Sequence, residues 1–220
     1  MGDADYAARR RQLVDGLRRR TDASERTLSA IAAVPRHEFV PADRRSHAYE
    51  DRPLPIGHGQ TISAPHMVAI MTDLLDVSPG DRVFEVGTGC GYHAAVVAEI
   101  VGGEAVYSAE YVSELADAAR DRLARLGYDV TVRAGDARTA FEDRPPFDAT
   151  YLTCAADGAV PATIVDRTCV GGHVVAPVET SGSVGAGGRS ESGQRLVRLT
   201  VRADGVDRED HGAVRFVPMR

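Results

Sequence analysis

The sequence has three glycines in the turn between a predicted strand and the predicted helix that follows it. Residues 85–92 read Glu-Val-Gly-Thr-Gly-Cys-Gly-Tyr, a glycine-rich turn between a short apolar run and a helical stretch. Glycine lets the backbone approach a ligand without a clash from Cβ, and open α/β sheets bind ligands beyond the carboxyl ends of their strands. We therefore expect Gly87, Gly89 and Gly91 to lie at a ligand site.

Three acids accompany this turn and indicate which ligand it takes. Glu85 stands two residues before the first glycine, Glu110 ends the second predicted strand, and Asp136 follows the third. A carboxylate at the end of the second strand can accept hydrogen bonds from two ribose hydroxyls. The last glycine of the dinucleotide-binding pattern G-x-G-x-x-G is replaced by Tyr92, so the match to that pattern is incomplete. An acid after the third strand can accept from an adenine amino group. The set favours S-adenosylmethionine, with its ammonium group near Glu85, over NAD, although each acid alone is more commonly a surface charge near a helix N-terminus.

Alternating strands and helices must position these residues. The expected parallel strands are 82–86, 106–110, 130–132, 147–152 and 173–178. Such alternation predicts an α/β fold, with right-handed crossovers and a mostly parallel, Rossmann-like sheet covered on both faces. Strand-like stretches at 195–202 and 214–218 predict an antiparallel edge to the sheet. Residues 181–194, which are rich in Gly and Ser, predict a mobile loop.

The first third of the chain is predicted to be helical, with irregular joints. Helical spacing covers about residues 5–20, about residues 24–33, and a stretch from Pro65 to Leu75. Asp22 with Glu25 three residues later resembles a capping box, and the Pro and Gly content of residues 51–60 predicts an extended loop. We expect one compact unit with two regions. Residues 1–78 would form a helical region with a substrate loop, and residues 79–220 the ligand-binding α/β domain.

Composition limits the class of protein. The 220 residues are 43% hydrophobic and 26% charged, enough to bury a core, and no apolar run approaches the ~20 residues of a membrane helix. The acidic start lacks an apolar segment, which predicts no secretion signal. Cys90, Cys154 and Cys169 lack metal-ligand or disulfide spacing. Arginine supplies all 26 cationic side chains, so Arg9–Arg11 and Arg18–Arg20 are interpreted as solvated helix faces, and the net charge of −6 argues against a nucleic-acid coat. We expect a cytoplasmic protein with no metal and no membrane or nucleic-acid partner.

Six segments of the chain occur in an order that one enzyme family shares. The most specific is residues 60–67, Gln-Thr-Ile-Ser-Ala-Pro-His-Met, preceded by Leu-Pro-Ile-Gly-His-Gly; the glycine-rich turn itself is common to most class I methyltransferases. The other matching segments are 32–40, 146–149, 171–178 and 213–218. Together, over about residues 28–219, the chain resembles the protein-L-isoaspartate (D-aspartate) O-methyltransferase family.

The resemblance implies a class I S-adenosylmethionine-dependent methyltransferase fold with helical additions at the N-terminus and a family-specific order of the last strands. It implies methyl transfer to the free α-carboxylate of L-isoaspartyl, and of D-aspartyl, residues in damaged proteins and peptides. The ester then cyclises to a succinimide, which begins repair. A monomer is expected, and Ser63 is the implied catalytic residue. The implied cofactor-binding residues are Thr61, Ile62, Ser63, His66, Glu85, Gly87, Gly89, Gly91, Glu110, Asp136 and Ala137.

Ser63 and His66 each have a structural alternative. A carboxylate acceptor is already ionised at neutral pH and needs no general base, so the enzyme's work is alignment and exclusion of water. Ser63 could hold the accepting carboxylate, or cap the helix that begins at Pro65, and both can be true. His66 is expected to face cofactor or substrate, with a surface histidine as the alternative.

Three residues depart from the family pattern. Ala137 stands where a second glycine is common, Cys90 where serine is frequent, and Glu179 where glycine is usual. They leave open a paralogous methyltransferase with another carboxylate acceptor, and a non-catalytic adaptor that binds the cofactor. A nucleic-acid-binding module is disfavoured by the net charge and by the lack of a base-stacking aromatic cluster.

Overall fold

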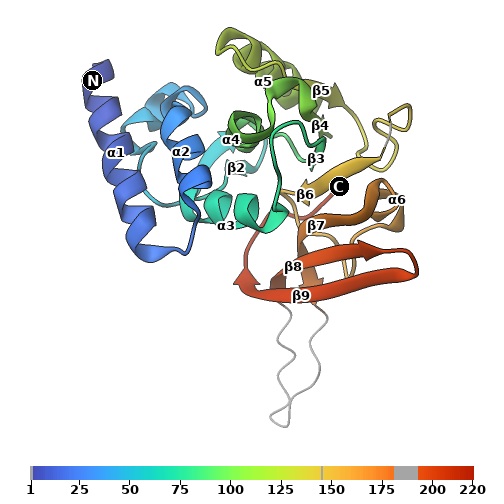
Figure 1. Ribbon diagram of the computed structural model, residues 1–220. Coiled ribbons are helices and arrows are strands. Elements are labelled where there is room, and N and C mark those ends of the chain that lie inside the picture. Colours follow the sequence, from blue (N-terminus) through green and yellow to red (C-terminus); the bar gives the residue numbers. More distant parts are fainter. Residues whose placement is uncertain (1, 145, 181–192) are drawn as a thin grey trace, which may run out of the picture.

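A seven-stranded sheet is the centre of the protein (Figure 1). The computed structural model describes residues 2–144, 146–180 and 193–220, and its sheet order is β5-β4-β3-β6-β7-β8-β9. The strands are β3 (Val83–Val86), β4 (Val106–Glu110), β5 (Thr131–Ala134), β6 (Phe147–Leu152), β7 (Thr168–Thr180), β8 (Gly193–Arg202) and β9 (Gly205–Val214). Strands β3 to β7 pair in parallel, whereas β8 and β9 are antiparallel. The predicted α/β class with an antiparallel edge is confirmed.

Helices follow the parallel strands and also precede the sheet in the chain. They are α1 (Asp3–Arg20), α2 (Glu25–Ala33), α3 (Pro65–Leu75), α4 (Tyr92–Val101), α5 (Ser113–Arg125) and α6 (Ala162–Val165), with short 3-10 turns η1 (Arg36–Glu38), η2 (Ala42–His47) and η3 (Gly103–Ala105). Figure 1 shows α1, α2 and α3 grouped together, with β8 and β9 at the opposite end of the sheet from β5. None of the helices in the described ranges is long and apolar enough to cross a membrane.

Alternation along the strands divides the core into two apolar clusters. Val83 and Val106 belong to the larger cluster, which also contains residues of α1 to α5. Phe84 and Val86 point the other way, into a second cluster that includes Ile164 of α6. Because successive strand residues face opposite sides of a sheet, both faces are buried, as a parallel sheet requires.

The start of α2 differs from the sequence prediction. Its N-cap is Ser24, whose hydroxyl accepts from the Thr27 N–H, and not Asp22. The Ser24 hydroxyl and N–H also donate to Asp73 of α3, at 2.7 and 2.6 Å. Asp22 and Ser24 are both of capping type, but the Ser24 hydroxyl can donate to the Asp73 carboxylate, whereas an ionised Asp22 carboxylate cannot.

The segment at 51–60 is more regular than predicted. Strands β1 (Leu54–Gly57) and β2 (Gln60–Ile62) form a two-stranded antiparallel sheet. His58 and Gly59 make the turn with φ of 52° and 72°, in the left-handed region that few residues adopt easily. The predicted extended loop is therefore a hairpin, and it delivers the family-specific segment to the core.

The C-terminal edge also differs from prediction. The predicted strand at 214–218 is wrong: β9 ends at Val214, and only Pro218 makes an isolated bridge, to Ala155. Most residues of β9 are exposed, so no apolar alternation marks it, and ion pairs such as Arg195–Asp210 at 2.7 Å link it to β8. Of the predicted mobile loop at 181–194, residues 181–192 lie outside the described residues, whereas 193 and 194 belong to β8.

The cap at α2 gives a direct stability test. Ser24→Ala removes the hydroxyl that caps the helix and donates to Asp73, and loss of an N-cap costs about 1 kcal/mol. Asp22→Ala is the matched control and should stay within about 0.5 kcal/mol of the parent. The free energy of unfolding in urea measures both. A larger loss for Asp22→Ala would show that the cap lies where the spacing alone had placed it.

Candidate functional site

A cleft opens beyond the carboxyl ends of β3, β4 and β5. The space within it, including the part open to solvent, is about 840 Å³. Strand β2, the start of α4 and the C-terminal segment complete its walls. The lining includes Gln60, Thr61, Ile62, Ser63, Glu85, Gly87, Thr88, Gly89, His93, Glu110, Tyr111, Val112, Gly135, Ala137, Thr153, Cys154, Pro218 and Arg220.

Most of the predicted site residues meet in this cleft. The structure brings together Thr61, Ile62, Ser63, Glu85, Gly87, Gly89, Glu110 and Ala137. Gly91, His66 and Asp136 do not belong to its lining. Gly91 instead begins α4, and a Cβ there would press on the Leu123 side chain of α5 at 3.1 Å, so it serves packing between helices.

The glycine-rich turn is fixed in its conformation by an acid at the end of the neighbouring strand. Glu110 accepts from the N–H of Gly89 at 2.8 Å and from the N–H of Val112 at 3.0 Å. Gly87 has φ of 95°, and a Cβ built on it would collide with the Thr153 hydroxyl. The turn therefore requires glycine at this position, and its backbone forms one wall of the cleft.

Glu85 lies in a row of polar side chains across three strands. In the parallel register Glu85 pairs with Ser108 of β4 and with Tyr151 of β6, so the three side chains share one face of the sheet. The Tyr151 hydroxyl donates to Glu85 Oε1 at 2.8 Å, and the Ser108 hydroxyl donates to Oε2. The Ser108 hydroxyl also lies 2.5 Å from that of Thr88. Of these residues, Glu85 and Thr88 line the cleft and form its floor, and Ser108 and Tyr151 hold Glu85 from the sides.

Burial controls the charge of this floor. Glu85 is fully buried, and among the described residues no arginine or histidine pairs with it. Burial raises the pKa of Glu85 to about 8, against the lowering effect of hydrogen bonds from Ser108 and Tyr151. Burial also lowers the pKa of His93 to about 3, so its imidazole is neutral. The free site thus holds a protonated carboxyl and a neutral histidine at pH 7.

His93 is a lining residue that sequence reasoning missed. Its Nε2 lies 3.0 Å from the Thr72 hydroxyl, whereas its Nδ1 is buried with no partner among the described residues. No spacing in the sequence marks His93, because it sits inside an apolar helix. Thr153 and Cys154 were also missed. They directly follow β6, at the same edge of the sheet as Glu110, so the rule that predicted Glu110 could have found them.

Ser63 and His66 separate in the structure. The Nδ1 atom of His66 lies 2.9 Å from Asp51 Oδ1, and the backbone N–H of His66 donates to the same carboxylate oxygen at 2.9 Å. Asp51 therefore accepts from a free backbone N–H in the first turn of α3, whose N-cap residue, Ala64, has no side-chain acceptor. The alternative in which Ser63 caps this helix is wrong, and Ser63 lines the cleft instead.

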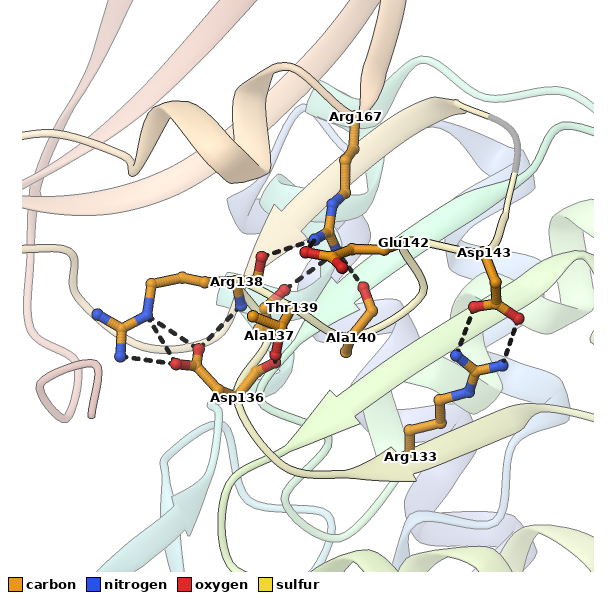
Figure 2. A network of polar contacts seen from close by, with 9 residues as sticks. All are labelled: Arg133, Asp136, Ala137, Arg138, Thr139, Ala140, Glu142, Asp143 and Arg167. Carbon is orange, nitrogen blue, oxygen red and sulfur yellow. Dashed lines mark hydrogen bonds and ion pairs between the residues drawn. The ribbon is translucent and has the colours of Figure 1, made fainter.

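Asp136 is turned toward its own loop. Its carboxylate accepts from the Arg138 N–H at 2.9 Å and from the Arg138 Nε at 2.9 Å to each oxygen (Figure 2). The hydrogen bond from Arg138 lowers the pKa of Asp136. The residue that follows, Ala137, lines the cleft in its place.

Comparisons with known proteins place the chain in a family. The family model described as protein-L-isoaspartate(D-aspartate) O-methyltransferase matches residues 8–220. Protein-L-isoaspartate O-methyltransferase 2 of Archaeoglobus fulgidus is 47% identical over 219 residues, covering 98% of this chain and 94% of that protein. The protein-L-isoaspartate O-methyltransferase of Methanothermobacter thermautotrophicus is 43% identical over 214 residues, covering 96% and 94%.

Solved structures agree on the fold. A protein-L-isoaspartate O-methyltransferase superposes with a TM-score of 0.83 at 26% identity over 96% of this chain, which spans 66% of that chain. A protein described as a protein-L-isoaspartate O-methyltransferase from Plasmodium falciparum, in complex with S-adenosyl-L-homocysteine, gives a TM-score of 0.78 at 23% identity, covering 96% and 98%.

The raised pKa of Glu85 predicts an unusual dependence of stability on pH. The pKa is 4.5 in the unfolded chain and about 8 in the folded protein, so the proton is held more tightly in the folded state. The stability contributed by this group is complete below pH 4.5 and is lost as the pH rises toward 8, at up to roughly 1.4 kcal/mol per pH unit. Glu85→Gln carries no titrating proton, so its stability relative to the parent should increase from pH 5 to pH 8.

Urea unfolding at pH 5, 6.5 and 8 measures this difference. Glu104→Gln, which changes an exposed carboxyl, is the matched control and should track the parent at each pH. If the difference in the free energy of unfolding between the parent and Glu85→Gln is the same at each pH, then Glu85 is ionised in the folded protein and burial does not raise its pKa.

Proposed function

The chain belongs to the protein-L-isoaspartate(D-aspartate) O-methyltransferase family, and we propose on that premise that it methylates the free carboxylate of L-isoaspartyl and D-aspartyl residues in damaged proteins. It is an S-adenosylmethionine-dependent carboxyl methyltransferase. The observation that carries the proposal is the cleft, where the specific segment at 60–63 faces the glycine-rich turn across one hollow. The Plasmodium falciparum protein solved with S-adenosyl-L-homocysteine shares the fold, which supports the choice of cofactor.

The cleft residues fit an adenosine that carries a cationic tail. The backbone at Gly87 leaves no room for a Cβ, and the buried Nδ1 of His93 has no partner among the described residues. Glu85 is a buried carboxyl that no cation contacts in the described part of the chain, so a positive ligand beside it would favour its ionised form. When bound, S-adenosylmethionine supplies a methyl group activated by a sulfonium sulfur.

We assign roles to the cleft residues on this basis. Glu110 lies at the end of β4 and suits the ribose hydroxyls, while its existing bonds keep the glycine-rich turn in shape. Ala137 and Tyr111 flank the space for the base. Asp136 joins them as a partner of the adenine amino group only if its pairing with Arg138 leaves an oxygen free. His66 acts through Asp51, by fixing the start of α3.

Ser63 is assigned to the acceptor. An isoaspartyl carboxylate is ionised at neutral pH, so it needs alignment and not deprotonation. Ser63 lines the cleft, and no helix N-terminus competes for its hydroxyl. That hydroxyl can donate to one carboxylate oxygen and leave the other free to attack, while Ile62 beside it is buried and helps to exclude water.

Partners follow from the reaction. Isoaspartyl-containing proteins and peptides are the proposed substrates. A monomeric state, a cytoplasmic location and the absence of nucleic-acid partners stay predictions, as does the division of the chain at residue 78.

A pair of peptides tests the reaction. One contains L-isoaspartate and its twin contains ordinary aspartate at the same position. We expect radioactive methyl transfer from S-adenosylmethionine to the isoaspartyl peptide alone, as an ester that base hydrolyses. Equal labelling of both peptides, or labelling of neither, would exclude this acceptor, and labelling of another carboxylic acid would indicate the paralogous function.

Ser63→Ala tests the acceptor role. Loss of a hydrogen bond that aligns a reacting group is expected to lower kcat/KM for the isoaspartyl peptide roughly 10- to 100-fold. Ser78→Ala, at an exposed serine, is the matched control and should keep parental activity. The affinity for S-adenosylhomocysteine should change little in either variant. Cofactor binding without turnover in the parent would support the non-catalytic adaptor.

A further inference from the structure

A turn after β5 is held from outside the cleft by one arginine (Figure 2). Arg167 lies between α6 and β7, and its own carbonyl accepts from the Phe147 N–H at 2.7 Å, which ties its backbone to the sheet. Its side chain is only 14% exposed. It extends to the turn at 136–140, away from the cleft lining.

The guanidinium of Arg167 is bound to carbonyl oxygens of that turn. Nη2 donates to the carbonyl of Arg138 at 2.6 Å, and Nη1 donates to those of Ala137, at 3.3 Å, and Ala140. A carboxylate, Glu142, lies 3.5 Å from Nη2. Arginine presents several N–H donors in a rigid planar fork, so one side chain can hold three carbonyls at fixed positions.

The turn that Arg167 holds through these carbonyls also sets the direction of the Ala137 N–H. The carbonyl of Asp136 accepts from the N–H groups of Thr139 and Ala140, at 3.1 and 2.9 Å, and so faces into the turn. In a planar trans peptide the N–H is directed opposite to the carbonyl. The N–H of Ala137 therefore points out of the turn, and it has no acceptor within the described part of the chain. Because Ala137 lines the cleft, this N–H is a donor available to a ligand.

The carboxylate of Asp136 is less available for that purpose. Arg138 pairs with it through Nε and through Nη2, at 2.9 and 2.8 Å, on the same turn. The backbone N–H of Ala137 is therefore free to donate to the edge of a base. A ring nitrogen of adenine that accepts a hydrogen bond complements such an N–H, whereas a base that carries a proton on that nitrogen opposes it.

We propose that Arg167 is a positioning residue that fixes the Ala137 N–H for recognition of the adenine base. The inference rests on the proposed function, because it takes the cleft to hold an adenosyl cofactor. Arg167 touches neither the cleft nor its ligand, and it acts through the carbonyls of Ala137, Arg138 and Ala140. Its effect should therefore fall on the choice of base and not on methyl transfer.

Calorimetric titration with two ligands tests this. S-adenosylhomocysteine carries the accepting ring nitrogen, whereas S-inosylhomocysteine carries a proton on that nitrogen and a carbonyl oxygen in place of the neighbouring amino group. In Arg167→Gln we expect the affinity for S-adenosylhomocysteine to fall about tenfold, the equivalent of one good hydrogen bond. Affinity for the inosyl ligand should fall much less, so the preference for adenine shrinks. A merely structural role would weaken both ligands equally.

Arg133→Gln is the matched control. It removes the same charge from the same region, but its partner is Asp143, at 2.6 Å, and not the turn carbonyls. It should keep the parental ratio of the two affinities. Arg167→Lys retains the charge with one nitrogen in place of the fork, and it should give an intermediate ratio. Titrations are made well below the lowest thermal unfolding midpoint of the set, and Arg167→Lys decides the question if Arg167→Gln does not fold.

The outcomes separate the two proposals. If the parent binds S-adenosylhomocysteine and the Arg167 variants keep its adenine preference, the positioning role is overturned and the cofactor site stands. If the parent binds neither ligand, the proposed function fails, and the positioning role fails with it.

Discussion

The parallel pairing of β3 with β4 and β6 is the constraint on which the site depends. Val86 is in register with Ala109 and with Leu152, so the three strands end together at one edge of the sheet. The segments that follow them therefore meet at the cleft, and each starts from a strand fixed by ladder hydrogen bonds. A register shift of one residue would turn Glu85 to the opposite face of the sheet and remove the cleft floor.

Two acids at or near the cleft, Glu85 and Asp136, lie in environments that shift their pKa values in opposite directions. Burial raises the pKa of Glu85, which has no cationic partner among the described residues, whereas the hydrogen bond from Arg138 lowers the pKa of Asp136. A buried carboxyl of this kind lowers stability at neutral pH, and such a cost is common at functional sites. A cationic ligand beside Glu85 offsets that cost, while Asp136 already has its cation. The cofactor therefore carries the positive charge that Glu85 lacks among the described residues.

Sequence patterns predicted the sheet and much of the site because both follow from periodicity and strand ends. The positions of Gly87 and Glu110 come from the rule that parallel strands present ligand residues at their carboxyl ends. Asp136 follows the same rule but does not line the cleft, because Arg138, two residues later, captures its carboxylate. Strand β9 was missed because an exposed edge strand shows no apolar alternation. His93 and Arg167 were beyond prediction, since their roles depend on contacts that only the folded chain creates.

We propose that one hollow holds the adenosyl cofactor against the glycine-rich turn, with Ser63 beside the acceptor. A crystal structure of the protein grown with S-adenosylhomocysteine tests this most directly. We expect electron density for the ligand between Gly87, Glu110 and Ala137, with its sulfur on the side of Ser63. Ligand density outside this hollow, or a Ser63 hydroxyl facing away from the sulfur, would contradict it.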